Sequence, residues 1–528
     1  MSRLTVVLSV LMRPHSAMEE SDMKNRPYSW IYTAVLVLVG ISIALTGGVA
    51  AQSTGYVDIA ASDLAGGGTA ADPYEITNAS ELQAMEDDLD ANYELVSDID
   101  ASQTARFDDG AGFEPVGDPK FNESTPPPFT GTFDGNNNTI TGLTIDRPDE
   151  TEIGLFGATG SSATLRNVAL VNVTVTGGDN VGGLVGRNNR GNIMTARATG
   201  SVNGTEGDVG GLVGGNFGTI TNASASGSVA GTNPVGGLVG LNGGEIQKAT
   251  ASGNVTGSQF VGGLVGDNFD GSVQIATASG SVTGEIDVGG LVGVNKALIQ
   301  NAAVSGSVTG ESNVGGLVGT NSGFRGEGTV RNTFAVGSVS GDNSVGGLVG
   351  DNRNNGTVEQ SYFNTEATGQ TTSAGSATGL TTTQMQGQAA AENMDGFDFD
   401  NTWTTTSEYP ALRALSEVDE NVDNDSPGSP QVQLSNITLT PQSVDSDAES
   451  THRLSFEAQN ISADENEDEF DITFPDNVEL VNYSNVAIDE KSSGVEMTGN
   501  TLEFSVNPTG GGSTQISGEL NVTVSATN

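Results

Sequence analysis

The sequence predicts an all-β protein whose centre is a β-solenoid (a β-helix-like coil) of about eight glycine-rich turns, with capping segments at both ends. Three observations carry this prediction. One hexapeptide recurs at a nearly constant spacing, short runs rich in Val, Ile and Thr alternate with Gly or Asn turns, and helix-forming stretches are missing between the copies. A C-terminal β-sandwich domain is predicted to follow the solenoid.

The repeat is the strongest signal. The string VGGLVG occurs seven times, and successive copies start 28, 26, 26, 27, 26 and 31 residues apart. One turn cannot bury its few apolar side chains alone, so we expect the turns of residues 151–363, each with three short β segments, to stack into one column. A weaker copy, Ile153–Gly157, precedes the seven, which begin at Val181, Val209, Val235, Val261, Val288, Val314 and Val345.

An asparagine stands two places after each copy. In stacked turns, identical Asn side chains hydrogen-bond to the copies above and below, and Asn also tolerates the left-handed backbone of a tight turn. We therefore predict a structural ladder rather than a ligand site. The glycines are interpreted in the same way, because no copy is followed by the helix and Lys of a phosphate-binding loop. The ladder residues are Asn188, Asn216, Asn242, Asn268, Asn295, Asn321 and Asn352.

The pattern VGGLVG-x-N, continued by I-x-N and A-x-G-x-V-x-G, resembles the GLUG motif, a repeat of bacterial and archaeal surface proteins. The resemblance covers about residues 72–415 and implies an architecture more than an activity. Some relatives are peptidases with an HExxH motif on a separate domain, and this chain has no such motif, so that activity does not transfer. The flanking segments that share the resemblance are 73–76, 92–100, 129–143, 361–366, 379–385 and 403–412.

The composition is strongly acidic, with 66 Asp and Glu residues against 19 Lys and Arg residues and a net charge of -47. Long-range repulsion excludes nucleic acid and anionic membrane faces as partners. At about 1 M salt the screening length is only about 3 Å, so this charge and the scarcity of Lys beside Arg indicate adaptation to brine. The chain contains no Cys, which excludes disulfides and thiolate zinc sites.

The N-terminus, residues 1–51, resembles an export signal. Lys24 and Arg26 precede an apolar run, residues 30–49, that ends in small residues suited to cleavage. An uncleaved transmembrane anchor is the alternative, because the run is about 20 residues long. The signal fits a start at Met23 or Met18 better than one at Met1.

Capping regions are predicted at residues 52–150 and 364–415, since exposed strand edges would otherwise pair with other molecules. In the first cap, Ser80–Gln83 looks like a capping box, and Leu82, Met85 and Leu89 share one helical face. In the second cap, large aromatic side chains are interpreted as cover for the end of the core, with a sugar platform as the alternative. These side chains are Phe397, Phe399 and Trp403.

Residues 416–431 are predicted to be an acidic linker and residues 432–528 an Ig-like β-sandwich, because several short alternating segments are separated by turn residues. Four linker residues have a spacing that suits Ca²⁺, which is the one weak candidate for a cofactor. The glycine and the bidentate glutamate of an EF-hand loop are missing, so a solvated linker is preferred. The four are Asp419, Asn421, Asp423 and Asp425.

Twelve sequons of the form Asn-x-Ser/Thr are candidates for glycosylation of an exported protein. They are Asn78, Asn122, Asn137, Asn172, Asn203, Asn222, Asn254, Asn355, Asn436, Asn460, Asn482 and Asn521.

No catalytic site is predicted. His15 lies outside the mature chain, His452 stands alone, and no nucleophile elbow, phosphate loop or HExxH motif is present. The charges in the repeats stand at unmatched positions, at Arg187, Glu245, Lys248, Asp267, Lys296 and Arg325. We therefore expect a secreted or cell-surface protein that is not an enzyme.

Three functions remain open at this point. The first is an adhesin or interaction scaffold whose partners are surface glycans, envelope proteins or other cells. The second is a structural envelope component or spacer without a specific ligand. The third, ranked lowest, is a polysaccharide-active enzyme, whose paired carboxylates the sequence alone cannot reveal. Contact with a membrane is expected only through the N-terminal segment, if it stays uncleaved.

Overall fold

The computed structural model describes residues 59–117, 127–323 and 328–415 with their side chains, and seven further strands between residues 433 and 526 by their backbone. The predicted export segment, the acidic linker and the four Ca²⁺ candidates lie outside the described residues. Within the described part of the chain, no helix is long and apolar enough to cross a membrane.

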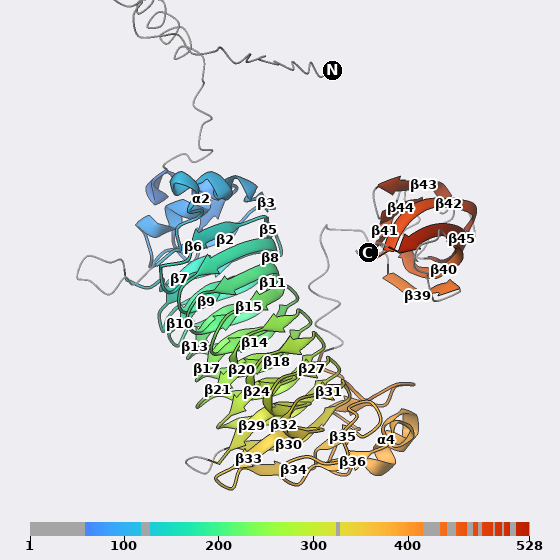
Figure 1. The fold of residues 1–528 in the computed structure, drawn as a ribbon. Helices are drawn as coiled ribbons and strands as arrows, with labels where there is room; N and C mark the ends of the chain where they lie inside the picture. Colours follow the sequence, from blue (N-terminus) through green and yellow to red (C-terminus); the bar gives the residue numbers. More distant parts are fainter. Residues whose placement is uncertain are drawn as a thin grey trace, which may run out of the picture. The chain divides into compact units, whose positions relative to one another are not determined.

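The centre of the molecule is the predicted β-solenoid, and it has about eight turns (Figure 1). Each turn, here called a coil, returns to the same position one layer further along. The described inter-coil strand pairs within residues 156–364 are parallel and in register, apart from a shift between Ala198 and Gly200. Equivalent residues of consecutive VGGLVG copies are direct partners: Val209 pairs with Val235, which pairs with Val261. The constant repeat spacing is therefore the coil length.

From Val209 onward each repeat contributes four strands, not the three predicted, whereas the first repeat has three because its segment Asn192–Gly204 is one continuous strand. Two of the four belong to one bent sheet, because the chain turns sharply at a Ser-Gly pair such as Ser226-Gly227 and then continues as a further short strand. There is no room for a side chain at this bend: a Cβ atom on Gly227 would lie 2.0 Å from the carbonyl oxygen of Gly200 in the preceding coil. In the sequence, a Ser-Gly pair cannot be told from an ordinary loop, so the sequence does not predict the additional strand.

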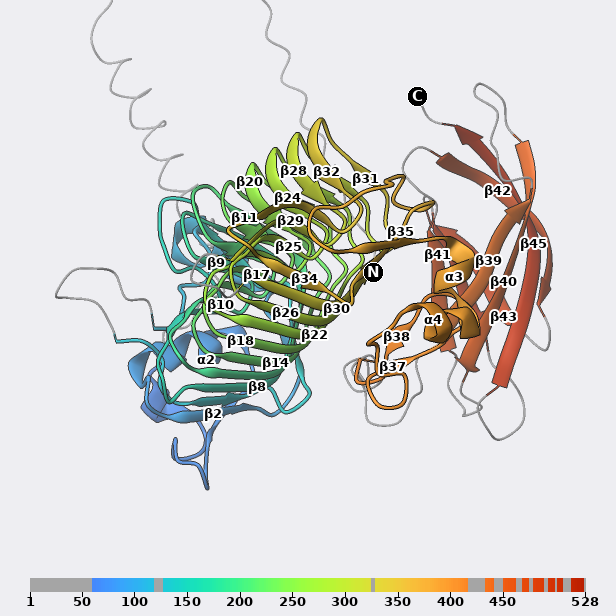
Figure 2. The ribbon, with the colours of Figure 1, turned by 90° about the horizontal axis from the view of Figure 1, so that it is seen from below.

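Three sheets form the faces of the coil, which Figure 2 shows from below. Sheet 2 has eight strands and sheet 3 has seven. Sheet 2 contains β7 (Phe156–Thr159), β10 (Val185–Asn188), β13 (Val213–Asn216), β17 (Val239–Asn242), β21 (Val265–Asn268), β25 (Val292–Asn295), β29 (Val318–Ser322) and β33 (Val349–Arg353). Sheet 3 contains β9 (Val181–Gly182), β12 (Val209–Gly210), β16 (Val235–Gly236), β20 (Gln259–Gly262), β24 (Ile286–Gly289), β28 (Ser312–Gly315) and β32 (Asn343–Gly346).

Sheet 1 is the bent sheet of 21 strands, and it also includes strands of both caps. Its longer strands are β8 (Thr164–Gly177), β11 (Asn192–Gly204), β14 (Thr219–Ala225), β18 (Glu245–Ala251), β22 (Ser272–Ala278), β26 (Leu298–Val304) and β30 (Thr329–Ala335), ending in β34 (Thr357–Glu359) and β35 (Tyr362–Asn364). Beyond the bend come β15 (Ser228–Ala230), β19 (Val255–Thr256), β23 (Val282–Thr283), β27 (Val308–Thr309) and β31 (Val339–Ser340).

The apolar residues of each repeat fill the core of the solenoid. In the fourth copy, Val261, Leu264 and Val265 are all fully buried. The glycines between them are required by close packing: a Cβ atom on Gly262 would lie 2.0 Å from the carbonyl oxygen of Val265 and 2.8 Å from that of Leu291 in the next coil. The hexapeptide therefore recurs because this narrow interior accepts only these sizes.

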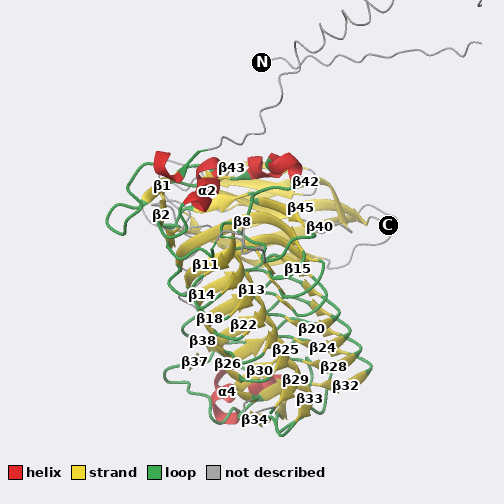
Figure 3. Ribbon diagram, turned by 90° about the vertical axis from the view of Figure 1, so that its left-hand side faces the viewer, coloured by secondary structure: helices red, strands yellow, loops and turns green. Residues whose placement is uncertain are grey.

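The N-terminal cap covers the first coil with short helices and strands (Figures 1 and 3). Leu82, Met85 and Leu89 are all buried, but they do not share one helix: Leu82 lies in α2, Met85 in the following 3-10 turn, and Leu89 in the turn after that. The N-cap of α2 is Asn78 rather than Ser80. The side chain of Asn78 accepts hydrogen bonds from the backbone N–H groups of Ser80 and Glu81. The elements of this cap are η1 (Ala61–Asp63), β1 (Tyr74–Ile76), α2 (Ala79–Gln83), η2 (Ala84–Asp87), β2 (Asn92–Leu95), β3 (Ile99–Asp100), η3 (Ser102–Arg106), η4 (Asp108–Gly110), β4 (Thr132–Asp134), β5 (Thr139–Thr141) and β6 (Thr144–Arg147).

The C-terminal cap closes the last coil and also covers one side of it. Backbone bonds from Gly347 to Thr372 and from Ala374 to Val349 occupy the edge that the last coil leaves open. A second hydrophobic core lies between the cap and the outer face of sheet 1. There, Phe334 and Tyr362 of sheet 1 contact aromatic side chains of the cap. Its elements are β36 (Thr378–Leu380), α3 (Thr382–Met385), α4 (Gly387–Asn393), β37 (Trp403–Thr404) and β38 (Ala411–Leu412).

The C-terminal strands pair in two antiparallel sheets, in the orders β39-β40-β45-β42 and β41-β44-β43. They are β39 (Gln433–Thr440), β40 (Ser450–Ile461), β41 (Asp468–Thr473), β42 (Val478–Ile488), β43 (Ser492–Thr498), β44 (Thr501–Val506) and β45 (Thr514–Ala526). His452 lies in β40.

Candidate functional site

The seven asparagines form one continuous row inside the coil. Each side-chain amide donates a hydrogen bond to the side-chain oxygen of the next, at 2.8–2.9 Å, from Asn188 to Asn352. The hydroxyl of Thr159 donates to Asn188 and extends the row by one coil. The remaining amide hydrogens reach backbone carbonyls, such as that of Ala297 at 3.0 Å from Asn295. A buried row that satisfies its own polar groups holds the turns and offers nothing to a ligand.

The residue after each ladder asparagine points out of sheet 2, next to the corner where the chain passes into sheet 1. In four consecutive coils this position holds Phe217, Gly243, Phe269 and Lys296. A Cβ atom on Gly243 would lie 2.8 Å from Cδ1 of Phe217, so this ring lies against the glycine. The ring of Phe217 therefore lies over the place of the side chain that Gly243 lacks, and the next aromatic residue of the row, Phe269, is two coils, or about 10 Å, from Phe217.

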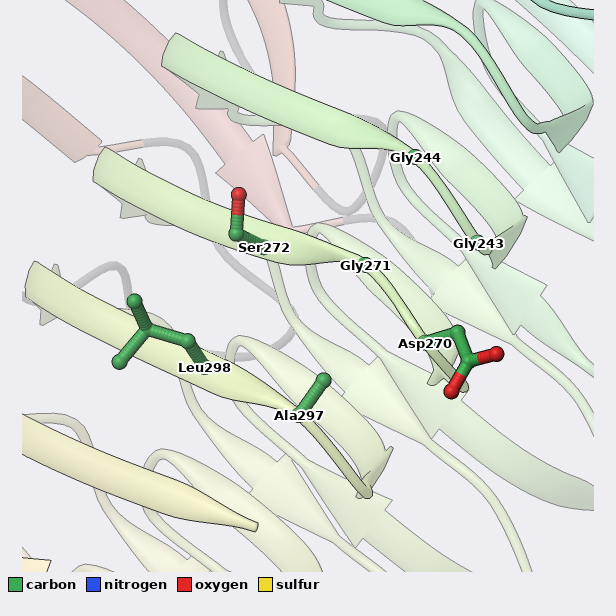
Figure 4. Close-up of a pocket in the computed structure, with 7 residues that line it drawn as sticks. All are labelled: Gly243, Gly244, Asp270, Gly271, Ser272, Ala297 and Leu298. Atoms are coloured by element: carbon green, nitrogen blue, oxygen red, sulfur yellow. The ribbon is translucent and has the colours of Figure 1, made fainter. Parts of the chain in front are cut away.

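An open depression of about 420 Å³, here called the corner hollow, begins at Gly243 and extends over the next two coils (Figure 4). Its floor is glycine because the ladder turns approach closely there: a Cβ atom on Gly244 would lie 2.1 Å from the carbonyl oxygen of Gly218. Figure 4 shows the side chains of Asp270 and Ser272 on the middle of three successive coils. The residues that line the corner hollow are Gly243, Gly244, Asp270, Gly271, Ser272, Ala297 and Leu298.

Two charges that the sequence left unmatched meet beside the corner hollow. Nζ of Lys296 lies 2.7 Å from Oδ2 of Asp267, one coil away, and 5.1 Å from the ring centre of Phe269. Burial raises the pKa of Asp267, while the ammonium of Lys296 opposes that rise. Asp267 also has an oxygen, Oδ1, without a hydrogen-bond partner. The carboxylate of Asp267 thus balances the charge of Lys296, and the ring of Phe269 helps to hold the ammonium in place.

A second partly buried carboxylate, Asp208, lies on the same side of the coil. Burial raises its pKa from 3.8 to about 7, and the nearby carboxylates Asp179 and Asp267 add to the rise. Elsewhere along this side, Arg187 lies 3.9 Å from Glu152 and its guanidinium carbon lies 5.2 Å from the ring centre of Phe217. In the described part of the chain, no group of three or more acidic or histidine side chains is arranged to hold a metal ion.

The aromatic side chains of the C-terminal cap form a core instead of a platform. Trp403 is fully buried, Phe397 is 8% exposed, and their ring centres are 4.8 Å apart. These rings cover the side of the last coils rather than only their end, because Phe334 of β30 lies under them. The alternative of a sugar platform at this place is therefore wrong.

The sequons differ in accessibility. Among the described residues, five carry their asparagine at an exposed position, whereas Asn78 and Asn222 are partly buried. The exposed ones are Asn137, Asn172, Asn203, Asn254 and Asn355. Asn122 lies outside the described residues, and for Asn436, Asn460, Asn482 and Asn521 the structure describes the backbone alone.

The repeat pattern alone does not single out Phe217, Gly243 or Phe269. They could be found by comparing the position after the ladder asparagine across the repeats. This position holds Phe in two of the seven repeats, whereas the buried residues of the repeat stay constant.

Comparison with known proteins supports the repeat assignment. The GLUG motif family matches residues 205–230 and 231–256. Halomucin of Haloquadratum walsbyi is 41% identical over 154 residues, which are 28% of this chain and 2% of halomucin. A putative Gly-rich membrane protein of Evansella cellulosilytica is 40% identical over 144 residues, which are 26% of this chain and 16% of that protein. No solved structure matches the chain.

Proposed function

This chain is a GLUG-repeat protein, and from that premise we propose that it is an exported cell-surface protein that acts as an adhesin or interaction scaffold. The matched segments are small parts of both relatives, so the proposal rests mainly on the coil itself. The description of the second relative as a membrane protein supports a place at the cell envelope.

One observation carries the proposal: the inside of the coil is repetitive and its outside is not. The buried Val, Leu and Asn residues recur in every copy, whereas the position after the ladder asparagine holds a different kind of residue in most coils and is at least partly exposed in six of the seven. The fold therefore fixes the interior and leaves the surface free to present different groups. The residues at this position are Asn189, Phe217, Gly243, Phe269, Lys296, Ser322 and Arg353.

A structural role without a specific ligand is the second proposal, and the asparagine ladder favours it. Six successive amide-to-amide bonds join seven coils into one hydrogen-bonded row. Such a row resists separation of the coils, as a spacer in an envelope requires. Ordered self-association of the chain in high salt would support this role, and a strictly monomeric chain would weaken it.

The experiment that tests the first proposal is binding of the labelled full chain to whole cells in high salt. Saturable binding that a competing unlabelled chain displaces is expected for an adhesin. Binding that rises linearly with concentration would contradict it and leave the structural role. We propose no enzymatic activity, and release of reducing ends or unsaturated products from a glycan panel would overturn that view.

Two further proposals concern the rest of the chain. We propose that residues 432–528 form an Ig-like β-sandwich, because their seven strands pair in two antiparallel sheets. Packing of the two sheets face to face in a crystal structure would test this. We also propose glycosylation at the exposed sequons, which mass spectrometry of the protein from its native cells would detect.

A further inference from the structure

Phe269 is the most exposed large apolar side chain among the described residues, at 43%. It directly precedes Asp270, which lines the corner hollow, and Lys296 directly precedes Ala297, which also lines it. Phe269 and Lys296 therefore border the hollow along the chain, and Nζ of Lys296 lies 5.1 Å from the ring centre of Phe269. The ring contacts the ammonium of Lys296 on one side, and its exposed part, next to the hollow, offers an apolar surface for a ligand.

The corner hollow suits a ligand with one apolar face and several hydroxyl groups. Its floor offers glycine backbone, its edge an aromatic ring, and its lining the carboxylate of Asp270 and the hydroxyl of Ser272. An aromatic ring stacks on flat C–H surfaces, and a carboxylate accepts two hydroxyl hydrogen bonds. The hollow crosses three coils, about 10 Å, so it is longer than one ring.

Other ligand classes fit less well. Asp270 and the nearby Asp267 disfavour anionic ligands, and the positive charge of Lys296 is already held by Asp267 at 2.7 Å. A peptide strand would need an open sheet edge, but here β18, β22 and β26 are paired with each other on both sides. An apolar ligand would need more than one exposed ring.

We propose that the corner hollow binds neutral pyranose sugar units of a glycan, with one ring stacked on Phe269 and its hydroxyls bound by Asp270 and Ser272. This inference rests on the proposed adhesin function and names its ligand class. It places the sugar contact on the side of the coil, far in sequence from the buried aromatic cluster of the C-terminal cap.

The test measures binding of the full chain, in about 1 M KCl, to a panel of neutral di- to hexasaccharides of glucose, galactose, mannose and N-acetylglucosamine. At least one should bind. Phe269→Ala should weaken that binding about tenfold, because the stacking surface is lost. Phe269→Trp should keep it, and Asp270→Asn should weaken it about threefold. Ile286→Ala is the matched control, since Ile286 is another exposed apolar side chain, at 37%, away from the hollow.

The outcomes separate this inference from the proposed function. If no oligosaccharide binds, or if Phe269→Ala and Ile286→Ala behave alike, the sugar site is wrong. If the chain still binds cells saturably in that case, the adhesin function stands with another surface. If the oligosaccharide binds and Phe269→Ala weakens it while cells are not bound, the sugar site stands and the adhesin function falls.

Discussion

At the scale of single residues, the ladder asparagines decide whether adjacent coils can stay together. Asn268 is fully buried, accepts a hydrogen bond from Asn242 at 2.9 Å and donates one to Asn295 at 2.8 Å. A buried amide or carbonyl that loses its partner keeps its desolvation cost without compensation. The ladder therefore stabilises the coil chiefly by leaving no buried polar group unpaired.

Replacing Asn268 by Ala should lower the free energy of unfolding by about 3 kcal/mol, because it leaves groups of both Asn242 and Asn295 unpaired. Denaturant titration at constant salt measures the loss. Asn352→Ala is the control at the half-buried end of the ladder, and it should cost less than half as much. Equal losses for the two variants would show that the ladder is not the source of the stability.

Asp208 should make the stability depend on pH. Its pKa is about 7 in the folded chain and 3.8 in the ordinary carboxyl, so between these values the folded state holds a proton that the unfolded state has lost. The free energy of unfolding should therefore fall as the pH rises from about 4 to about 7. Asp208→Asn should remove that fall and stabilise the chain at pH 8 by about 2 kcal/mol, a value reduced from the full shift because the carboxylate is only partly buried.

The comparison is made by thermal unfolding of the two chains across this pH range at fixed salt. Asp342→Asn, which removes an exposed carboxylate elsewhere on the coil, serves as the control, and its stability should change with pH as that of the parent chain does. Parallel curves for Asp208→Asn and the parent would contradict the assignment.

Backbone strain at one outward position offers a stabilising substitution. The coils of sheet 1 place a residue in the left-handed region there, and Asn222 and Asn301 tolerate it well. Lys248 holds the same position with a φ of 57°. Lys248→Asn should raise the free energy of unfolding by about 1 kcal/mol. Thr250→Asn, two residues further along β18, should not raise the free energy of unfolding. If it does, the added asparagine itself stabilises the chain, rather than the relief of backbone strain.

At the scale of elements, the VGGLVG strands depend on glycines that face the next coil. Gly262→Ala should lower the free energy of unfolding by about 3 kcal/mol, because its Cβ atom would meet backbone oxygens at 2.0 and 2.8 Å. Gly215→Ala is the matched control: its Cβ atom would come closest to a side-chain oxygen of Asn180, at 2.8 Å, which can move aside as backbone cannot. Circular dichroism melts of both variants check this, and similar losses would contradict the packing argument.

The elements also show what the sequence could and could not predict. The coil follows from the recurrence of Val, Leu and Gly, since each coil must repeat the same buried shape. The Ser-Gly bend in sheet 1 could not be predicted, because the same residue types form bends within a sheet and loops between strands. The place of Trp403 on the side of the coil was missed because its partner Phe334 lies far away in sequence and follows no period.

The corner hollow was not predictable for a related reason. Its lining comes from three successive coils, at Gly243, Asp270 and Ala297, and the sequence separates these three by about a full period each. Only the register of the asparagine ladder shows that they are neighbours. Pairing of Lys296 with Asp267 depends on the same register.

At the scale of the whole molecule, the acidic charge is distributed unevenly. Residues 151–363 contain 14 of the 66 acidic residues but 9 of the 19 basic ones. Residues 59–150, the N-terminal cap, contain 20 acidic and 3 basic residues. Self-repulsion should therefore act much more strongly on the cap than on the coil, and the difference should be visible only where salt does not screen it.

Dilution from about 1 M to about 0.01 M salt lengthens the screening distance from about 3 Å to about 30 Å. We expect the N-terminal cap to lose protection from hydrogen exchange first, while amides of the coil in β17, β21 and β25 stay protected. Exchange followed by mass spectrometry resolves the two regions, and dilution at constant salt is the control. If cap and coil lose protection together, the coil depends on its cap for stability. If far-UV circular dichroism and exchange both stay unchanged, the acidic residues do not adapt this chain to brine, and its charge must serve another purpose.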